Sequence, residues 1–446
     1  MKKSGILSLL AVFTVIFFIA GCAIFVPINV QLLPMKGNGT YTYSNAQLTI
    51  DGGMRMLKMQ GSHYEMGYAY GYLLGNEIIN TLQHYVYWVL LLKYPLQTYD
   101  DVYSFQAKFD WDPGYSNEMV GMLEGIYATV PESNLMISPP NGEVHKLGLK
   151  DLMVINTIGD WTCSSFAAWG PGQTTGNGML LARNFDYLVD SSSMCKMFHM
   201  VTVCKPNDGS YSWVGVGVCG VLGAMTGMNQ YGVAGVLHNT DFFPTTDDYG
   251  YMGRLFALRK ILELTGPAQG PSDVETLLDG YPAYYGNNIF VCFSNTSLPL
   301  NDQAAVFEYD GDSTQPSGRA TVRYASDNAT LPNNAYFIQS FNLTNCMINV
   351  NHYLKRKTSA PGYTDDSGER YVLIQHYMTN AILNDGNVTE SEAKNILMYV
   401  DDYFTLHSVI FEPRIGKLII YLNDTPNKTA WECKEYNYTL TDLFNW

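Results

Sequence analysis

Apolar positions recur with a helical period in the first part of this chain and with a strand period in the rest. Helical spacing is clearest at residues 61–92, 116–130 and 149–158. Residues 48–59 alternate more like a strand or two. We therefore expect residues 34–162 to be a mainly helical segment.

From residue 163 onward, short runs suited to strands are separated by turn-forming residues. Turns of hairpin length between such runs favour an antiparallel sheet. The predicted strands cover residues 165–169, 179–185, 198–204, 212–218 and 233–237.

The second half of the chain adds helices and another set of strands. A helix is predicted at 251–264, and Ser272-Asp273-Val274-Glu275 reads as the capping box of the next one. Two strand-rich blocks separated by helices predict an α+β fold, a two-sheet sandwich with helices outside. The remaining predicted elements are strands at 288–293, 304–309, 320–324 and 336–340, helices at 368–383 and 390–400, and a closing hairpin at 408–411 and 417–421.

The composition is that of a folded protein with a large core. Of 446 residues, 47% are hydrophobic and only 15% are charged, which is untypical of a disordered chain. This length suits two or three folding units, or one large body with an accessory segment. The formal net charge is -15 and no long run of lysine or arginine occurs, so no nucleic-acid partner is expected.

Residues 1–33 are predicted to be a signal peptide or a membrane or lipid anchor. Lys2 and Lys3 precede an apolar run at 6–20, which Gly21-Cys22 and further apolar residues up to Leu33 follow. Three interpretations stay open: simple cleavage, a lipobox that leaves Cys22 lipidated, and an uncleaved membrane anchor. All three export the rest of the chain, to the cell surface or beyond.

Two further patterns fit export without requiring it. Eight Asn-x-Ser/Thr sequons occur, although such motifs also arise by chance. Six cysteines besides Cys22 and Cys163 could form three disulfides, or stay free and buried. The sequons begin at Asn38, Asn295, Asn328, Asn342, Asn387, Asn423, Asn427 and Asn437, and the six cysteines are Cys195, Cys204, Cys219, Cys292, Cys346 and Cys433.

The candidate chemistry centres on Cys163. It follows Thr162 at the start of a predicted strand, and the next strand ends in Arg183-Asn184-Phe185-Asp186. A thiol with a pKa of about 8.5 is a poor nucleophile at neutral pH, but cleavage of the Thr162–Cys163 bond would free an α-amine that can act as its base. We interpret the spacing of Arg183 and Asp186 as placing both on one face of the strand, and so in one site.

Neither a cofactor nor a metal is predicted. Gly215-x-Gly217-x-x-Gly220 has the spacing of a dinucleotide fingerprint, but it follows strands and opens no convincing helix. The eight histidines show no metal-ligand spacing. A papain-like pair of Cys163 with His238 or His352 stays open as an alternative.

These motifs resemble those of the penicillin acyltransferase-like cysteine enzymes, in the choloylglycine hydrolase and acid ceramidase group of N-terminal-nucleophile hydrolases. The resemblance extends from Gly61 to the final hairpin, with His238 standing where related chains more often have an apolar residue. Its motifs are, in order, Cys163, Arg183-Asn184-Phe185-Asp186, Gly227-Met228-Asn229-Gln230-Tyr231-Gly232 with Asn239, Asn351-His352-Tyr353, and Ser367-Gly368-Glu369-Arg370-Tyr371.

The resemblance implies a four-layer αββα sandwich that cleaves itself between Thr162 and Cys163. It implies Arg183 beside the nucleophile, Asp186 on the α-amino group and Asn239 in the oxyanion hole. Asn351 would be a catalytic polar residue, and Arg370 would complete the charge network.

The resemblance also implies how the protein works. Residues 34–162 would stay bound to the catalytic body, residues 163–446, and a small N-acyl amide would be cleaved through a thioester. Acyl transfer to an amine is a variant outcome. A lipid amidase or esterase of the same group, and a catalytically silent surface-anchored binding protein, are the alternatives.

Overall fold

The computed structural model of the chain describes residues 31–90, 99–139, 142–157, 161–171, 174, 178–187, 194–240, 249–331, 342–356, 365–401, 405–423 and 428–446. The chain divides into two units, Met1–Leu33 and Pro34–Trp446, and the elements described below belong to the second. The predicted leader up to residue 30, with Cys22, lies outside the described residues, and so does the predicted strand 336–340.

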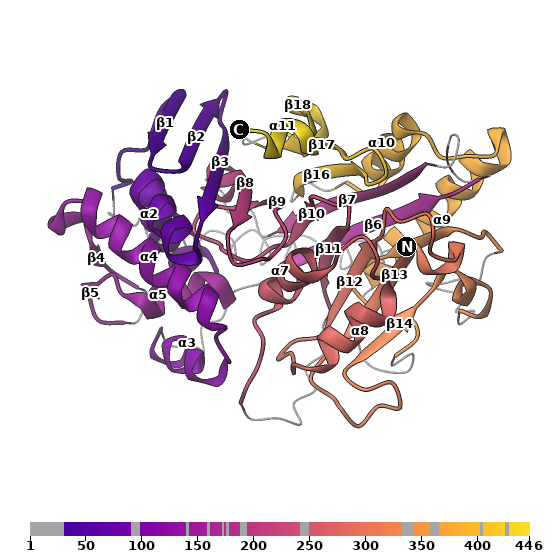
Figure 1. The fold of residues 1–446 in the computed structure, drawn as a ribbon, viewed down its shortest axis with the longest axis horizontal. Coiled ribbons are helices and arrows are strands. Elements are labelled where there is room, and N and C mark those ends of the chain that lie inside the picture. The colour runs from indigo at the N-terminus through magenta and orange to yellow at the C-terminus, as the bar shows by residue number, and fades with distance from the viewer. Residues whose placement is uncertain are drawn as a thin grey trace, which may run out of the picture. The chain divides into compact units, whose positions relative to one another are not determined.

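Two sheets form the centre of the second unit (Figure 1). In the described ranges the larger has ten strands in the order β1-β2-β3-β8-β9-β10-β11-β12-β13-β14, and the smaller has six in the order β15-β6-β7-β16-β17-β18. The described strand pairs run antiparallel, except that β3 and β8 are parallel. The strands of the larger sheet are β1 Gly39–Tyr43, β2 Ala46–Asp51, β3 Met54–Gly61, β8 His199–Pro206, β9 Trp213–Val218, β10 Thr226–Asn229, β11 Ala234–Asn239, β12 Asn287–Cys292, β13 Ala304–Tyr309 and β14 Ala320–Arg323. Those of the smaller are β15 Cys346–Asn349, β6 Trp161–Trp169, β7 Met179–Tyr187, β16 Thr405–Glu412, β17 Lys417–Leu422 and β18 Glu435–Thr439.

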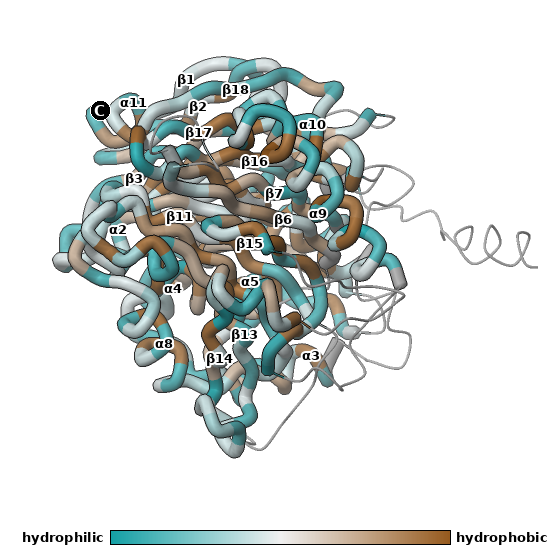
Figure 2. Tube along the Cα trace, turned by 90° about the vertical axis from the view of Figure 1, so that its right-hand side faces the viewer, coloured by the Kyte–Doolittle hydropathy of each residue, from teal (hydrophilic) through white to brown (hydrophobic). Residues whose placement is uncertain are grey.

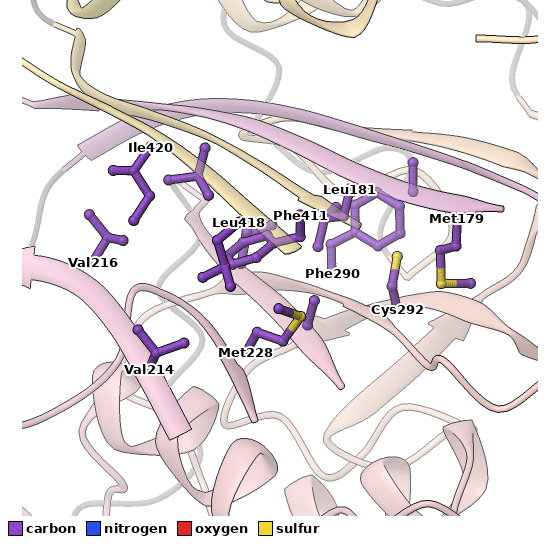
Figure 3. Packing of buried hydrophobic residues seen from close by; sticks show 14 of the residues in the cluster. Met179, Leu181, Val214, Val216, Met228, Phe290, Cys292, Phe411, Leu418 and Ile420 are labelled. Atoms are coloured by element: carbon purple, nitrogen blue, oxygen red, sulfur yellow. The ribbon is translucent and has the colours of Figure 1, made fainter. Parts of the chain in front are cut away.

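Apolar side chains from both sheets fill the space between them (Figure 3). Leu181 and Phe411 of the smaller sheet belong to the same buried cluster as Val214, Met228 and Phe290 of the larger one. Because successive side chains of a strand point to opposite faces, this face of each sheet is committed to the inter-sheet core.

Helices cover the outer face of each sheet. The other face of β6 and β7 packs against α9 Asp365–Asp385 and α10 Glu390–Tyr399, whose polar and apolar positions are interleaved in Figure 2. On the larger sheet, Leu258 and Leu262 of α7 Arg254–Leu264 lie over Gly235 and Gly227. The helix α8 Pro271–Asp279 contacts α7 and the strands β13 and β14. The layers are therefore helix, sheet, sheet, helix, and the predicted αββα fold is confirmed.

The segment before Cys163 contains helices and also contributes to the larger sheet. Its helices are α2 His63–Asn80, continued by a π-helix at Thr81–Leu90, then α3 Tyr99–Phe105, α4 Pro113–Thr129 and α5 Leu149–Thr157. A capping box of Ser62 and Glu65 starts α2. Strands β1, β2 and β3 come from the same segment, and β3 pairs with β8, which follows Cys163 in sequence. The segment also contains short 3-10 helices at Gln106–Lys108 and Glu132–Asn134 and a short hairpin of β4 Met136–Ile137 and β5 His145–Lys146. The helix α6 Met194–Met197 follows β7.

Several expectations about elements were wrong in detail. The strands predicted from 165 to 237 divide between the two sheets, and those from 288 to 324 extend the larger sheet instead of forming the second one. Ser272 does not cap α8, because this helix begins at Pro271 and Asp273 accepts a hydrogen bond from the Gly270 amide. The short strands β10 and β15 were missed, and the final hairpin is followed by β18 and by α11 Leu440–Phe444.

The structure shows whether the described cysteines are bonded and whether the sequon asparagines are buried. Cys204, Cys219, Cys292 and Cys346 are free thiols, so the three-disulfide alternative is wrong, while the Cys195 side chain lies outside the described residues. Two of the sequon asparagines, Asn328 and Asn423, are buried and donate hydrogen bonds to main-chain oxygens. Among the described helices, none has the length and apolar character needed to cross a membrane.

Glycines let α2 and α4 pack with their main chains in contact, and this contact is testable. A Cβ atom placed on Gly71 would lie 2.0 Å from the Met122 oxygen, so Gly71→Ala must push the helices apart. We expect a loss of about 1–3 kcal/mol in the free energy of unfolding, measured by urea denaturation. Gly37→Ala is the control, since nothing lies within 4 Å of the added atom; equal stability of the two variants would contradict the close packing.

Candidate active site

Cys163 lies in β6, opposite Phe185 of β7, and its side chain is 0% exposed. The thiol donates a hydrogen bond to the Leu237 main-chain oxygen at 3.7 Å, and Arg183 Nη2 donates to Sγ at 2.9 Å. Burial raises the pKa of the thiol, and the positive charge of Arg183 offsets this only in part. In the intact chain the sulfur is therefore a protonated, covered thiol.

Arg183 is fixed by groups of the larger sheet. Its Nη2 donates to the Leu237 oxygen at 3.0 Å, and its Nη1 donates to the Met225 oxygen and to Thr226 Oγ1. Its guanidinium also lies over the Phe185 ring, 4.7 Å from the centroid. Arg183 is thus a buried cation whose hydrogen-bond partners come from β6 and β7, from Met225 and Thr226 at the start of β10, and from β11.

A pair of buried histidines continues this network. Thr226 Oγ1 lies 2.9 Å from His407 Nε2, and His407 Nδ1 lies 3.1 Å from His199 Nε2. Burial lowers the pKa of His407 well below its ordinary value, and His199 and Arg183 add to this effect. A neutral His407 therefore orients the Thr226 hydroxyl that Arg183 uses. Sequence reasoning missed Thr226, His199 and His407, because three residues far apart in sequence carry no local motif.

Asn351 and Arg370 hold the main chain of Cys163. The Cys163 amide donates to Asn351 Oδ1 at 2.8 Å, and Arg370 Nη2 donates to the same oxygen at 3.0 Å. Arg370 Nη1 donates to the Cys163 oxygen and, at 2.8 Å, to Ser164 Oγ. Asp366, one turn earlier on α9, pairs with Arg370 at 2.8 Å. The structure thus brings Asn351, Arg370 and Arg183 together on Cys163.

Asn239 joins the site through its main chain. Its carbonyl oxygen accepts from Asn351 Nδ2 at 2.8 Å, while its side-chain Oδ1 accepts from Arg254 Nη1 at 2.6 Å. Because Arg254 holds the oxygen, the amide –NH2 is the end of this side chain that is left to act as donor. Arg254, at the first residue of α7, was not predicted and carries no sequence signal of its own.

Asp186 does not share a face of β7 with Arg183, and that expectation was wrong. Residues three apart in a strand point to opposite faces, and the even-numbered Leu180 and Ala182 face α9 and α10. Asp186 pairs with Thr162 in the strand ladder and accepts a hydrogen bond from the Thr405 hydroxyl. Burial raises the pKa of Asp186 to about 7, although the charge of Arg370 favours its ionised form.

The structure does not support a papain-like Cys–His pair or a dinucleotide-binding site. His238 bonds Ser165 at 2.8 Å and His352 bonds Ser367 at 2.8 Å. Burial lowers the pKa of both rings, that of His352 to about 3, so neither is suited to be a base at neutral pH. Gly215 and Gly217 lie in the antiparallel strand β9, which no helix follows directly. The described side chains contain no His, Cys, Asp and Glu group suited to a metal ion.

No family model and no curated protein matches the sequence. Solved structures similar to this chain include an N-acylethanolamine-hydrolyzing acid amidase ortholog of Caenorhabditis elegans, with 14% identity and a TM-score of 0.38, covering 56% of this chain and 93% of that one. A mutant conjugated bile acid hydrolase of Clostridium perfringens has 12% identity and a TM-score of 0.38, covering 62% and 96%. Penicillin V acylase of Agrobacterium tumefaciens has 14% identity and a TM-score of 0.39, covering 63% and 88%. At this level of similarity, the activity has to be argued from the residues of the chain itself.

The burial of Cys163 predicts its reactivity. In full-length chain under native conditions, Cys163 should resist iodoacetamide, because its thiol is covered and its pKa is raised. Cys433 is only partly buried and serves as the reactive control. Peptide-level mass spectrometry of the full-length band measures both, and equal labelling of the two cysteines would contradict the buried site.

The raised pKa of Asp186 predicts how stability depends on pH. Between its ordinary value and about 7, the folded carboxyl keeps a proton that the unfolded one has released, so stability should fall as pH rises through this range. In a Cys163→Ala background, Asp186→Asn should make Tm less dependent on pH over that interval. Asp385→Asn, at an exposed position, should leave the dependence unchanged. Parallel profiles with and without Asp186 would refute the effect of burial.

Proposed function

We propose that this chain is a self-processing cysteine amidohydrolase, which cuts its own Thr162–Cys163 bond and then hydrolyses linear N-acyl amides. The observation that carries the proposal is that three separate side chains hold the nitrogen, the oxygen and the sulfur of one cysteine. These are Asn351, Arg370 and Arg183. A cysteine that only fills space in a core needs none of them.

In the first step the Cys163 sulfur attacks the carbonyl carbon of Thr162. The C–N bond breaks as the C–S bond forms, and the thiol proton passes to the departing nitrogen, which leaves a thioester and a free α-amine. Water then hydrolyses the thioester, giving the Thr162 carboxyl group and restoring the thiol. Asn351 Oδ1, which already accepts from the Cys163 nitrogen at 2.8 Å, keeps that nitrogen in place throughout.

In the second step the freed α-amine takes the thiol proton and the sulfur attacks the acyl carbon of a substrate amide. The C–N bond of the substrate breaks as the C–S bond of the acyl-enzyme forms, and the α-ammonium returns its proton to the departing amine. Arg183, at 2.9 Å from Sγ, favours the thiolate, and the Asn239 amide is positioned by Arg254 to donate to the developing oxyanion. Asp186 would bind the α-amine, because its partner in the strand ladder is Thr162, the residue whose bond to Cys163 is cut. Water releases the acid product, and an amine in place of water gives acyl transfer.

The site is closed until the cut is made. Trp161 and Thr162 continue β6 alongside β7, and the Cys163 side chain is 0% exposed in the uncut chain. The cut alone would not detach the earlier segment, because β3 is paired with β8 inside the larger sheet. Residues 34–162 would therefore stay as a subunit of the enzyme. We propose further that the protein works after export, on the basis of the N-terminal pattern at residues 1–33.

Substitution of Cys163 tests both steps. Wild type should give two chains, the second with 284 residues and Cys163 at its N-terminus, since 446 minus 162 is 284. Cys163→Ala should remain one chain and hydrolyse no N-acyl amide, whereas Cys163→Ser should be cut slowly, because a hydroxyl is the weaker nucleophile. N-terminal sequencing, intact mass and a screen of N-acyl amines and N-acyl amino acids measure these outcomes. Normal cutting of Cys163→Ala would refute the proposal, and ester turnover without amide turnover would favour the esterase alternative.

A further inference from the structure

A second cluster of buried charges lies between α7 and the helices α2 and α4, apart from the residues that contact Cys163. Arg259 of α7 donates to Glu118 of α4 at 2.7 Å and to Glu263, one turn along α7, at 2.7 Å. His63, the first residue of α2, closes the cluster with Nδ1 at 2.8 Å from Glu118 and Nε2 at 3.1 Å from Asp208. Arg259 and Glu118 are 0% and 1% exposed, so solvent does not screen this pair.

Neutral aromatic side chains also contact the charged groups of the cluster. The Arg259 guanidinium lies over the rings of Tyr115 and Trp213, at 4.4 and 5.3 Å from their centroids. Tyr115 donates its hydroxyl to Glu263 at 2.6 Å, and Trp213 Nε1 donates to the same carboxylate at 3.1 Å. Such geometry is what allows buried charges to be tolerated, and removing one member leaves the others uncompensated.

The members come from both sides of the Thr162–Cys163 bond. His63, Tyr115 and Glu118 precede it, whereas Asp208, Trp213, Arg259 and Glu263 follow it. If the bond is cut, the hydrogen bonds of Arg259 to Glu118 and of His63 to Asp208 become contacts between two chains. Dissociation would then expose a carboxylate and a guanidinium that the uncut protein buries together, or leave each of them buried without its partner of opposite charge.

We propose that Arg259, Glu118, Glu263 and His63 form an ionic joint that keeps the segment before Cys163 bound to the catalytic body after cleavage. The inference rests on the proposed function for the existence of two chains. The cluster itself is present in the intact structure, so its contribution can be measured without any cut.

Charge balance makes the joint dependent on pH. Arg259 supplies one positive charge, and Glu118 and Glu263 supply two negative charges, so a protonated His63 neutralises the buried group. Asp208 contacts the outer nitrogen of the same ring. Burial lowers the pKa of His63, and so does the charge of Arg259, whose Nη2 lies 3.4 Å from the ring nitrogen Nδ1. The hydrogen bond and charge of Glu118, with the charge of Glu263, outweigh both effects and the pKa is raised. The stabilisation is complete below the ordinary histidine value and is lost as pH rises through the raised one, so the joint is tightest in mildly acidic solution.

His145 provides a matched control. It pairs with Asp151 at 3.0 Å and its pKa is also raised, but both residues precede the cut. His63→Gln and His145→Gln therefore each remove a carboxylate-bound histidine, and only the first removes one that bridges the two segments.

The experiment has one arm on the cut protein and one on the uncut protein. Gel filtration of the cut wild type at about pH 5.5 and about pH 8.5, on either side of the usual histidine pKa, should show the two chains together, more completely at the lower pH. At both pH values a larger fraction of the earlier chain should dissociate in His63→Gln and Glu118→Gln than in the wild type, whereas His145→Gln should match the wild type. In the uncut Cys163→Ala protein, His63→Gln should lower Tm by several degrees at the lower pH and have less effect at the higher one.

The outcomes separate this inference from the proposed function. A protein that is never cut refutes self-processing, and the uncut arm still decides whether the cluster stabilises the contact between the segments. An unchanged Tm for His63→Gln and Glu118→Gln would overturn the joint whether or not the chain is cut. Equal release of the earlier chain by His63→Gln and His145→Gln would also overturn it, because that result would reflect general destabilisation.

Discussion

The placement of one fully buried guanidinium, that of Arg183, constrains the whole site. A cation in the space between two sheets must have every donor directed at an acceptor, because unpaired charge in that environment is costly. Here the acceptors are the main-chain oxygens of Asn184, Met225 and Leu237, the Thr226 hydroxyl and the Cys163 sulfur. The ends of β10 and β11 must therefore lie opposite β7 in one register. That register places Cys163 beneath β11.

The sequence patterns predicted where helices and strands lie in the chain better than they predicted which strands pair with one another. Periodicity identified α2, α4 and α5, and the strands β6 and β7, within a few residues. It did not reveal which sheet each strand joins, because pairing depends on contacts between segments far apart. Short strands such as β10, with four residues, have too few positions to show alternation.

The candidate site was predictable where a motif is local. Cys163, Asn351 and Arg370 were all predicted, and the structure brings them together. The error at Asp186 came from treating a three-residue spacing as one face of a strand, which the two-residue period forbids. Arg254 and His407 could not be found, because each acts through a partner distant in sequence, Asn239 and Thr226.

The way Cys163 is held also has a consequence for the timing of activity. The groups on its nitrogen, oxygen and sulfur come from residues 351, 370 and 183, which meet only when the smaller sheet and α9 have formed. Under the proposed mechanism, a chain that is still unfolded or wrongly folded lacks the arrangement needed to cut itself. Cleavage would then work as a folding checkpoint, because only natively folded molecules would acquire the new N-terminus.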